Sequence, residues 1–399
     1  MKKKSLTFWI FAAMAAGIVL GATAPQVAVK LAPVSNIFLR LIKSIIAPLI
    51  FATLVYGLAG HGNLKAMGRI GAKSLVYFWL ITTIALVIGL LAVNLVRPGA
   101  GMNLKATTED LKLAQKAPSF AGVLEHTFPA SIIDAMAKGE VLQIVVFSLL
   151  FGAACASLGG KARPLVEFCE SLAEVMFRYT NYVMYLAPLG VGAAIAVTVG
   201  NKGLGVLFGL GKLILTMYAA QIFFVAFVLG AVIALARIPL RRFYEAAKEP
   251  FVIAFSTASS EAALPRALEN MERFGVPKHI VAFVLPTGYS FNLDGTTLYL
   301  SLASVFIAQA AGIELSIEQQ IVMMLTLMLT SKGVAGVPRA ALVVLTGTIS
   351  TFHLPLEGVA VLLGIDAVLD MARTSVNVLG NCLASAVVAR WEGHSFPDA

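Results

Sequence analysis

Polar and charged residues recur along one apolar segment near the carboxyl end of the chain, Gly364–Arg390. Most are spaced three or four positions apart, which places them broadly along one face of a helix: Asp366, Asp370, Arg373, Thr374, Asn377 and Asn381. If this helix lies in a bilayer, the arginine costs between about 3 and more than about 10 kcal/mol, which a partner must offset. One explanation is a structural ion pair between Asp370 and Arg373. The other is a ligand site, in which Arg373 holds a carboxylate through a bidentate fork and Asp370 holds an ammonium group.

A second polar group interrupts the preceding apolar stretch at Asn292 and Asp294, beside Gly295. Glycine allows the backbone to unwind and expose its carbonyl groups. One carboxylate, an amide oxygen and backbone carbonyls suit a hard cation such as sodium, and Asp294 could instead carry a proton. A kink whose hydrogen bonds are satisfied internally is the alternative.

Two further stretches, Ser256–Glu261 and Ser331–Pro338, are too polar or too rich in glycine for plain membrane spans. They predict the tips of two helical hairpins that dip into the membrane and return. Backbone amides at the helix amino termini of such tips bind anions. Ordinary loops between short interfacial helices are the alternative.

The two predicted hairpins carry an internal repeat. Ala262–Ala267 resembles Ala335–Ala340, and an acidic residue follows each copy at nearly the same distance, Asp294 after the first and Asp366 after the second. Two such units facing each other make a pseudo-symmetric site near the middle of a membrane, as in many secondary transporters.

The composition of the 399-residue chain is that of a polytopic membrane protein, since 59% of residues are apolar, 13% are charged and the mean hydropathy is +0.87. Soluble domains have roughly 45–50% apolar and about 25% charged residues, so a soluble enzyme, a disordered protein and a fibrous protein are excluded. The net charge of +9 fits the positive-inside rule better than nucleic-acid binding. The cysteines have no paired spacing and suit buried apolar positions rather than a disulfide or metal site: Cys155, Cys169 and Cys382.

Stretches of about 20 residues without Lys, Arg, Asp or Glu predict membrane-spanning helices. Before Pro250 they are Ser5–Val29, Ser44–Leu64, Ser74–Val96, Val141–Gly160, Tyr179–Asn201 and Leu213–Ala236. The first is longer than the apolar part of a signal peptide, so we expect it to be retained. Basic groups at alternate ends of these spans place the amino terminus on the cytoplasmic side: Lys2–Lys4, Lys65 and Arg69, Lys161 to Arg178, and Arg237 to Lys248. The segment Arg97–Glu140 then lies outside and has no strong fold signal.

Two other classes of membrane protein fit the sequence poorly. An ion channel would need a ring of like charges or a filter-like segment, and the sequence contains neither. The sequence also lacks the HExxH and GxSxG motifs that would indicate an intramembrane enzyme. We therefore expect no catalytic residues and no prosthetic cofactor.

The polar segments together resemble those of a known family. Ser256–Pro265, Ser290–Thr296, Thr330–Pro338 and Asp366–Asn381 are similar, in order and spacing, to the signature segments of the dicarboxylate/amino acid:cation symporters, the glutamate transporter family. The resemblance covers essentially the whole chain. The bacterial proton-coupled glutamate/aspartate symporters are the most similar in pattern.

This resemblance implies an all-α homotrimer with eight transmembrane helices and two re-entrant hairpins, at about Pro250–Arg273 and Glu314–Ser350. A scaffold would include helices 1 and 2, within residues 1–65. It would also include an outer loop with helices 4 and 5, within residues 98–204. Residues 66–97 (helix 3) and 205–399 (helix 6, hairpin 1, helix 7, hairpin 2 and helix 8) would form a transport domain that moves like an elevator. Both termini would be cytoplasmic, in a bacterial cytoplasmic membrane.

The resemblance also implies a role for each matching residue. Arg373 would contact the side-chain carboxylate of an acidic amino acid and Asp370 its amino group. The positions around the substrate would be Ser259, Ser260, Thr296, Val334, Gly336, Thr374 and Asn377, and the outer gate would include Ser331, Gly333, Ala335 and Pro338. Dicarboxylate carriers of the family lack an aspartate at the position of Asp370, which favours glutamate and aspartate as substrates.

The departures from the family pattern concern the coupling ion, which would involve Asn292, Asp294, Asp366 and Asn381. Sodium-coupled relatives have a carboxylate where this chain has Asn381, methionine at Leu293, and Tyr, Thr and Ser where we align Phe78, Ile81 and Thr82. Losing these oxygens weakens a sodium site, so we expect proton coupling, with Asp294 or Asp366 as the proton carrier and no certain metal site. Sodium coupling and a C4-dicarboxylate substrate remain the alternatives.

Overall fold

The computed structural model describes residues 6–59, 64–102, 128–331 and 340–396, and every regular element among them is a helix. The predicted hairpin-tip residues Gly333, Val334, Ala335, Gly336 and Pro338 lie outside the described residues, as does most of the second copy of the repeat.

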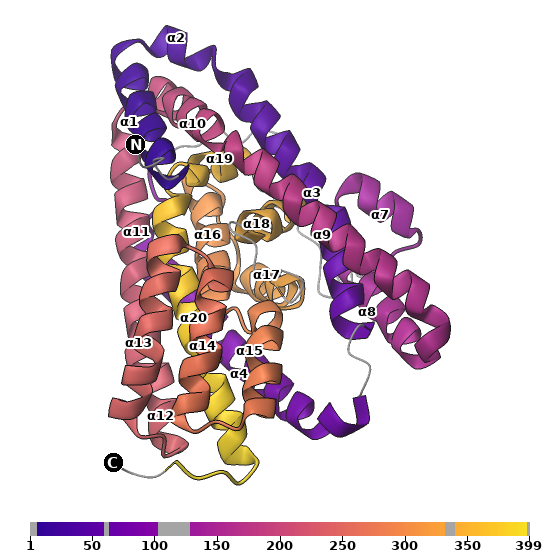
Figure 1. Ribbon diagram of the computed structural model, residues 1–399. Helices are drawn as coiled ribbons and strands as arrows, with labels where there is room; N and C mark the ends of the chain where they lie inside the picture. Colours follow the sequence, from indigo (N-terminus) through magenta and orange to yellow (C-terminus); the bar gives the residue numbers. More distant parts are fainter. Residues whose placement is uncertain (1–5, 60–63, 103–127, 332–339, 397–399) are drawn as a thin grey trace, which may run out of the picture.

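The first half of the chain contains both long helices and short ones (Figure 1). In chain order they are α1 (Leu6–Thr23), α2 (Pro25–Val29), α3 (Ala32–Ala59), α4 (Leu64–Val96), α7 (Ile132–Lys138), α8 (Val141–Leu158), the 3-10 turn η1 (Gly159–Ala162), α9 (Arg163–Tyr185) and α10 (Ala187–Lys202). The short helix α7, which the sequence did not indicate, begins at the capping residue Ser131 and ends at Gly139, whose positive φ terminates it.

The second half contains the segments with unusual polar residues. Its helices are α11 (Gly205–Phe223), the π-helical turn η2 (Phe224–Leu229), α12 (Gly230–Leu235), α13 (Leu240–Thr257), α14 (Ser260–Phe274), α15 (Lys278–Phe291), α16 (Asp294–Ala310), α17 (Ile317–Thr330), α18 (Ala340–Thr351), α19 (Glu357–Leu363) and α20 (Asp366–Trp391). Breaks fall at Ala258 and at Asn292, where the sequence predicts a hairpin tip and an interrupted helix.

Several predicted helix limits are wrong, because charges and prolines end fewer helices than we expected. Helix α3 begins at Ala32 and continues through Arg40, since a long basic side chain can extend along a helix toward polar surroundings. Helix α13 begins at Leu240 and passes the buried Pro250, which removes only one backbone donor.

The span predicted at Tyr179–Asn201 joins two elements. Helix α9 ends at Tyr185 and α10 begins at Ala187, with Pro188 in its first turn, a position where the missing proline N–H costs nothing.

The helices pack in two groups, which meet where α19 contacts α10, α18 contacts α3 and α17 contacts α8. Helix α1 lies against α10, and α3 lies against α8 and α9; α13 and α14 pack together and against α20, and α16 contacts both α4 and α20 (Figure 1). Two apolar clusters of buried side chains fill the interior, one around α16 and α18, and one around α15 and α20.

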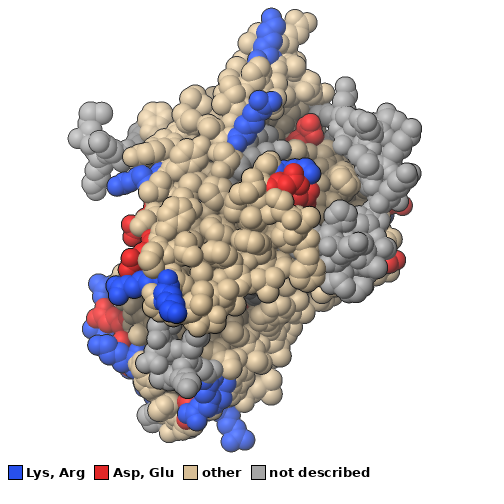
Figure 2. Space-filling view, turned by 90° about the vertical axis from the view of Figure 1, so that its right-hand side faces the viewer, with Lys and Arg blue, Asp and Glu red and all other residues tan. Residues whose placement is uncertain are grey.

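Three helical stretches are long and apolar enough to cross a membrane: Arg69–Val96, Gln143–Thr180 and Gly205–Leu235. Shorter apolar helices occur at Phe8–Thr23, Ala47–Tyr56, Ala187–Asn201 and Ile317–Thr330. Figure 2 shows Lys and Arg side chains toward the lower and the upper end of the face in view, with a broad area free of charged side chains between them. Lengths, composition and this distribution fit a helical membrane protein.

The end of α20 is attached to α4 by ionic contacts. Glu392 accepts hydrogen bonds from Lys73 (Nζ–Oε1 2.7 Å) and from Arg69, and Lys73 also donates to the carbonyl of Trp391. These two basic side chains lower the pKa of the Glu392 carboxyl.

Close packing of α4 on α16 depends on a glycine, which gives a test of the fold. A Cβ atom at Gly89 would lie 2.2 Å from Ser301 Oγ and 2.3 Å from the Leu298 carbonyl oxygen. We expect Gly89→Ala to destabilise the protein by roughly 1–3 kcal/mol, measured as a lower thermal midpoint in detergent. The matched control is Gly211→Ala in α11, where a Cβ would meet no atom within 4 Å. Equal midpoints for the two variants would contradict this packing.

Candidate functional site

The charged residues of α20 form a closed arrangement inside the protein. Arg373 donates from Nε to Asp370 Oδ1 and from Nη1 to Asp366 Oδ1, both at 2.8 Å. The guanidinium is 1% exposed, and the two carboxylates are buried. Thr374 adds a hydrogen bond to Asp370 at 3.1 Å. The predicted face of the helix is therefore present, and Arg373 pairs with two aspartates instead of one.

An aromatic ring completes the surroundings of this arginine. Arg373 Cζ lies 4.6 Å from the centre of the Tyr299 ring, a cation–π distance. Arg373 Nη2 has no hydrogen-bond partner among the residues that the structure describes. Two nitrogens of the guanidinium are thus fixed by aspartates, and the third remains available within the protein interior.

The break between α15 and α16 forms a second polar group with α20. Asn292 Nδ2 donates to Asp294 Oδ2 (3.2 Å) and to Asn381 Oδ1 (3.3 Å), and Asn381 Nδ2 donates in return to the Asn292 carbonyl (3.3 Å). All three side chains are fully buried. The two amides are joined to each other and to the carboxylate across 89 positions of sequence.

Glycines allow these side chains to approach the neighbouring backbones. A Cβ at Gly288 would lie 2.0 Å from Asn381 Oδ1, and a Cβ at Gly380 would lie 2.1 Å from Asp294 Oδ2. At Gly295 a Cβ would lie 2.4 Å from the Arg373 carbonyl oxygen, so α16 touches the backbone of α20 beside the arginine.

A reciprocal pair connects the two polar groups. The Thr296 backbone N–H donates to Asn377 Oδ1 (3.1 Å), and Asn377 Nδ2 donates to Thr296 Oγ1 (2.8 Å). Along α20, the residues therefore run from the arginine group through this pair to the amide group. Nine of the predicted site residues belong to this single polar column: Asn292, Asp294, Thr296, Asp366, Asp370, Arg373, Thr374, Asn377 and Asn381.

The predicted hairpin residues Ser259 and Ser331 make their described hydrogen bonds within their own segments and not to this polar column. Ser259 caps α14 by accepting a hydrogen bond from the Ala262 N–H (3.2 Å), after Ala258 reverses the chain at φ 49°. Ser260 is buried at the start of α14, and Ser331 is buried beyond α17 with its hydroxyl on the Met328 carbonyl. The contact of Ser259, Ser260 and Ser331 with substrate therefore stays a prediction.

Three residues at the site were missed by the sequence reasoning. Tyr299 lies in an apolar run of α16, where an aromatic residue is indistinguishable from core. From α11, Gln221 Nε2 donates to the Gly295 carbonyl (3.3 Å) and the Tyr218 hydroxyl donates to the Val368 carbonyl (2.9 Å). Gln221 could have been found as a lone buried amide within a predicted span. Gln221 lies three residues before the start of the π-helical turn η2, a feature frequent at functional sites.

The charges of the column limit what it can bind. Among the described residues, the buried acids are Asp294, Asp366 and Asp370, and the buried base is Arg373. No group of three or more metal-ligating His, Cys, Asp or Glu occurs in the described part of the chain. The column can present a guanidinium to an anion, a carboxylate to an ammonium group, and buried carboxylates to protons or a cation.

A buried column of polar residues between interrupted helices in an apolar bundle is typical of a secondary membrane transporter. The comparison with known families agrees: the chain belongs to the sodium:dicarboxylate symporter family, whose model matches residues 6–391. The protein is a membrane transporter and not an enzyme.

Three relatives show the range of activities found near this sequence. The chain is 45% identical to the proton/sodium-glutamate symport protein of Bacillus caldotenax, over 98% of this chain and 96% of the relative. It is 45% identical to the proton/glutamate-aspartate symporter of Escherichia coli K12, over 99% and 94%. It is 44% identical to the C4-dicarboxylate transport protein of Pseudomonas fluorescens, over 97% and 89%.

The contact between Arg373 and Tyr299 gives a second test. The Tyr299 hydroxyl has no hydrogen-bond partner among the described residues, so Tyr299→Phe should leave the thermal midpoint unchanged or slightly raised. Tyr299→Leu removes the ring beneath the guanidinium and should cost at least about 1–2 kcal/mol. A Phe variant as unstable as the Leu variant would show that the hydroxyl, and not the ring, supports the arginine.

Proposed function

We propose that this protein is a proton-coupled symporter of acidic amino acids, glutamate and aspartate, in the cytoplasmic membrane. The observation that carries the proposal is the orientation of Arg373. Two aspartates and a tyrosine ring fix the guanidinium, and its Nη2 remains without a hydrogen-bond partner among the described residues. A fixed guanidinium with a remaining donor is suited to a carboxylate.

The aspartate beside the arginine supports an amino acid as the substrate. Asp370 is three residues from Arg373 on the same face of α20, so a ligand carboxylate on the arginine brings its ammonium group within reach of Asp370. A plain C4-dicarboxylate has no ammonium group, and its second carboxylate would face a buried aspartate. The name of the Escherichia coli relative agrees with an acidic amino acid, whereas that of the Pseudomonas relative is the competing case.

The charge of the polar column explains why a cation must accompany the substrate. The three buried carboxylates outnumber the one buried guanidinium among the described residues. An acidic amino acid adds a net negative charge to a region that is already negative, which is costly at low dielectric. Entry of a proton or a metal cation with the substrate offsets this charge.

The amide of Asn381 supports a proton as that cation. Its Nδ2 donates to the Asn292 carbonyl, and the amide of Asn292 donates to Asp294. These N–H donors lie against the oxygen atoms that a sodium ion would need as ligands. In sodium-coupled members, as the family resemblance implies, a carboxylate stands at the position of Asn381 and supplies both charge and an oxygen.

Asp294 is the better of the two proposed proton carriers. Asp366 accepts a hydrogen bond from the Arg373 guanidinium, and a proton on Asp366 would weaken that buried ion pair. Asp294 accepts a hydrogen bond from the neutral amide of Asn292 (3.2 Å), and a proton on Asp294 leaves the Asp366–Arg373 ion pair intact.

The family resemblance extends the proposal to the whole assembly. It includes a homotrimer of eight-helix subunits, a scaffold of residues 1–65 and 98–204, and an elevator movement of residues 66–97 and 205–399, with both termini cytoplasmic. Helices α13 and α14 would form the first re-entrant hairpin and α17 and α18 the second. The outer gate would include Ser331 and the predicted tip residues beyond it.

Substitutions in the arginine group test the substrate. We expect Arg373→Ala to abolish glutamate and aspartate uptake into proteoliposomes, because the side-chain carboxylate loses its partner. Asp370→Asn should reduce glutamate binding at least about 10-fold and leave succinate binding much less affected, since only glutamate has an ammonium group. Binding is measured with labelled ligand on protein that elutes as a single folded species. Retained glutamate affinity in Arg373→Ala, or equal losses of both ligands in Asp370→Asn, would refute these roles.

Ion gradients test the coupling. Labelled glutamate uptake should be driven by an inward proton gradient without sodium, and an inward sodium gradient at equal pH should give no accumulation. Asn381→Asp should make uptake depend on sodium, because a carboxylate then replaces the amide donor beside Asn292 and Asp294. Asp294→Asn should lose proton-driven accumulation but retain exchange of internal for external glutamate.

Sodium-driven uptake by the unaltered protein would favour the alternative of a sodium-coupled symporter. Proton-driven accumulation that survives Asp294→Asn would move the proton carrier to Asp366.

A further inference from the structure

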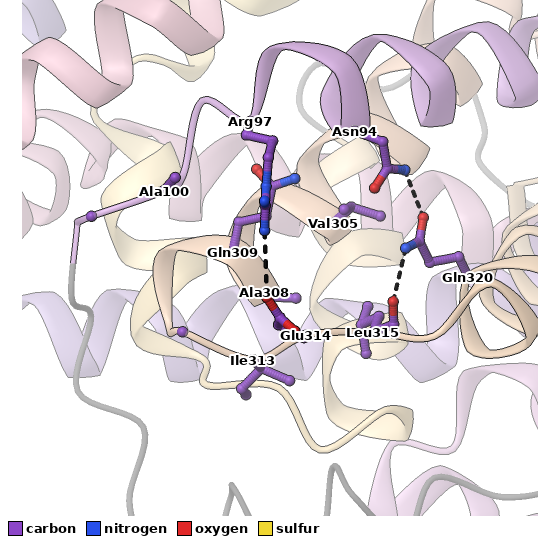
Figure 3. Close-up of a pocket in the computed structure, with 12 residues that line it drawn as sticks. Asn94, Arg97, Ala100, Val305, Ala308, Gln309, Ile313, Glu314, Leu315 and Gln320 are labelled. Carbon is purple, nitrogen blue, oxygen red and sulfur yellow. Dashed lines mark hydrogen bonds and ion pairs between the residues drawn. The ribbon is translucent and has the colours of Figure 1, made fainter.

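A polar cavity lies away from the column, where the ends of α4 and α16 meet the start of α17. Its volume is about 520 Å³, and its polar lining includes Asn94, Arg97, Gln309, Glu314 and Gln320 (Figure 3). None of these side chains belongs to the proposed substrate or coupling site.

Amide side chains fix the walls of this cavity. Asn94 Nδ2 donates to Gln320 Oε1 (2.6 Å), and Gln320 Nε2 donates to the Leu315 carbonyl (3.0 Å). Gln309 Nε2 donates to the Val93 carbonyl (3.0 Å), and the Gly99 N–H donates to Gln309 Oε1 (3.4 Å). The cavity is therefore a preformed feature, held by contacts between segments more than 200 positions apart.

One positive and one negative side chain form an ion pair in the lining of the cavity (Figure 3). Arg97 Nη2 and Glu314 Oε1 are 3.6 Å apart, beyond hydrogen-bond distance, and the two side chains are 61% and 90% exposed. Arg97 also has a positive φ of 49°, an uncommon backbone conformation for a residue other than glycine. Both charges thus remain accessible to a ligand.

Exposed aliphatic side chains lie beside this polar lining on both helices. On α4, Leu91 and Leu95 are 63% and 87% exposed and share a face with Asn94. On α17, Ile317 and Ile321 are 78% and 44% exposed and share a face with Gln320. The Asn94–Gln320 hydrogen bond therefore lies at a seam between two helices with apolar side chains on either side.

We propose that this cavity binds the headgroup of a phospholipid with phosphoethanolamine chemistry, with an acyl chain along the apolar side chains of α4 and α17. A ligand with a single net charge would be attracted by one member of the Arg97–Glu314 pair and repelled by the other. A net-neutral zwitterion satisfies both, with its phosphate on Arg97 and its primary ammonium on Glu314. The order of exposure matches, since the ammonium group is the outermost part of such a lipid and Glu314 is the more exposed residue.

The bound lipid would connect two helices with different roles. In the proposed architecture helix α17 would be the first arm of the second hairpin, before the predicted gate, and its contact with α4 at Asn94–Gln320 lies at the cavity. An occupied cavity holds the start of α17 against α4. This inference does not depend on the identity of the transported substrate or coupling ion.

The test compares lipids with identical acyl chains and different headgroups. Purified protein in detergent is supplemented with dioleoyl phosphatidylethanolamine, phosphatidylcholine or phosphatidylglycerol, and the thermal midpoint is measured. Phosphatidylethanolamine should raise the midpoint by at least about 2 °C more than the other two. Phosphatidylcholine has no N–H donor for Glu314, and phosphatidylglycerol has no cation. Equal shifts for the three lipids would overturn the proposal.

Substitutions in the Arg97–Glu314 pair test whether the lipid preference arises at this cavity. Arg97→Gln and Glu314→Gln should each abolish the difference between lipids, which is read within one variant and so is insensitive to its basal stability. The exchange of charges, Arg97→Glu with Glu314→Arg, preserves an ion pair but reverses its direction, so it should not restore the preference. Restoration would indicate a purely structural pair and overturn the proposal. The matched controls are Arg163→Gln and Glu167→Gln, an exposed pair at 2.7 Å on α9, which should keep the preference.

Two further experiments distinguish a bound phospholipid from a small soluble zwitterion. Soluble phosphoethanolamine and alanine, at the concentration of the lipid, should give no shift, and a full shift with either would overturn the role of the acyl chain. Native mass spectrometry of the unaltered protein, with equimolar phosphatidylethanolamine and phosphatidylcholine, should retain the former in excess. Equal retention would also contradict the proposal.

Discussion

The burial of one guanidinium imposes the main constraint on this structure. Arg373 is 1% exposed within an apolar bundle, and leaving such a charge without its partners costs about 3–5 kcal/mol. Asp366 and Asp370 must therefore lie one turn apart on the same face of α20, and Tyr299 must bring its ring to the guanidinium from α16. The glycine at position 295 follows from this, because only a residue without a side chain allows α16 to approach the arginine backbone.

The remaining helices support this contact from outside. Helix α11 donates two hydrogen bonds to backbone carbonyls adjacent to site residues, from Gln221 to Gly295 and from Tyr218 to Val368. Helix α4 packs closely on α16 through Gly89. A polar site in the middle of an apolar protein thus requires polar contacts behind it, since each buried backbone or side-chain group needs a partner.

The sequence indicated which residues of α20 share a face more accurately than it indicated the helix limits. Three- and four-residue spacing along α20 is a local property, so the face containing Arg373 could be deduced. The break at Asn292 followed from its polar and glycine neighbours. The start of α13 at Leu240 could not be deduced, because tertiary packing carries that helix past Pro250. The roles of Tyr299 and of the Asn94–Gln320 contact depend on residues distant in sequence, which periodicity does not reveal.

The amide pair of Asn292 and Asn381 has a consequence for the unloaded protein. A symporter returns across the membrane without its cargo, and an ion site emptied of its ion leaves oxygen atoms facing one another without a counter-charge. Here each amide donates to an oxygen of the same network, so the protein's own atoms supply these donors. If the coupling ion is a proton, as proposed, the empty carrier would keep the shape of this region on its return, with no metal cation to release before the next cycle.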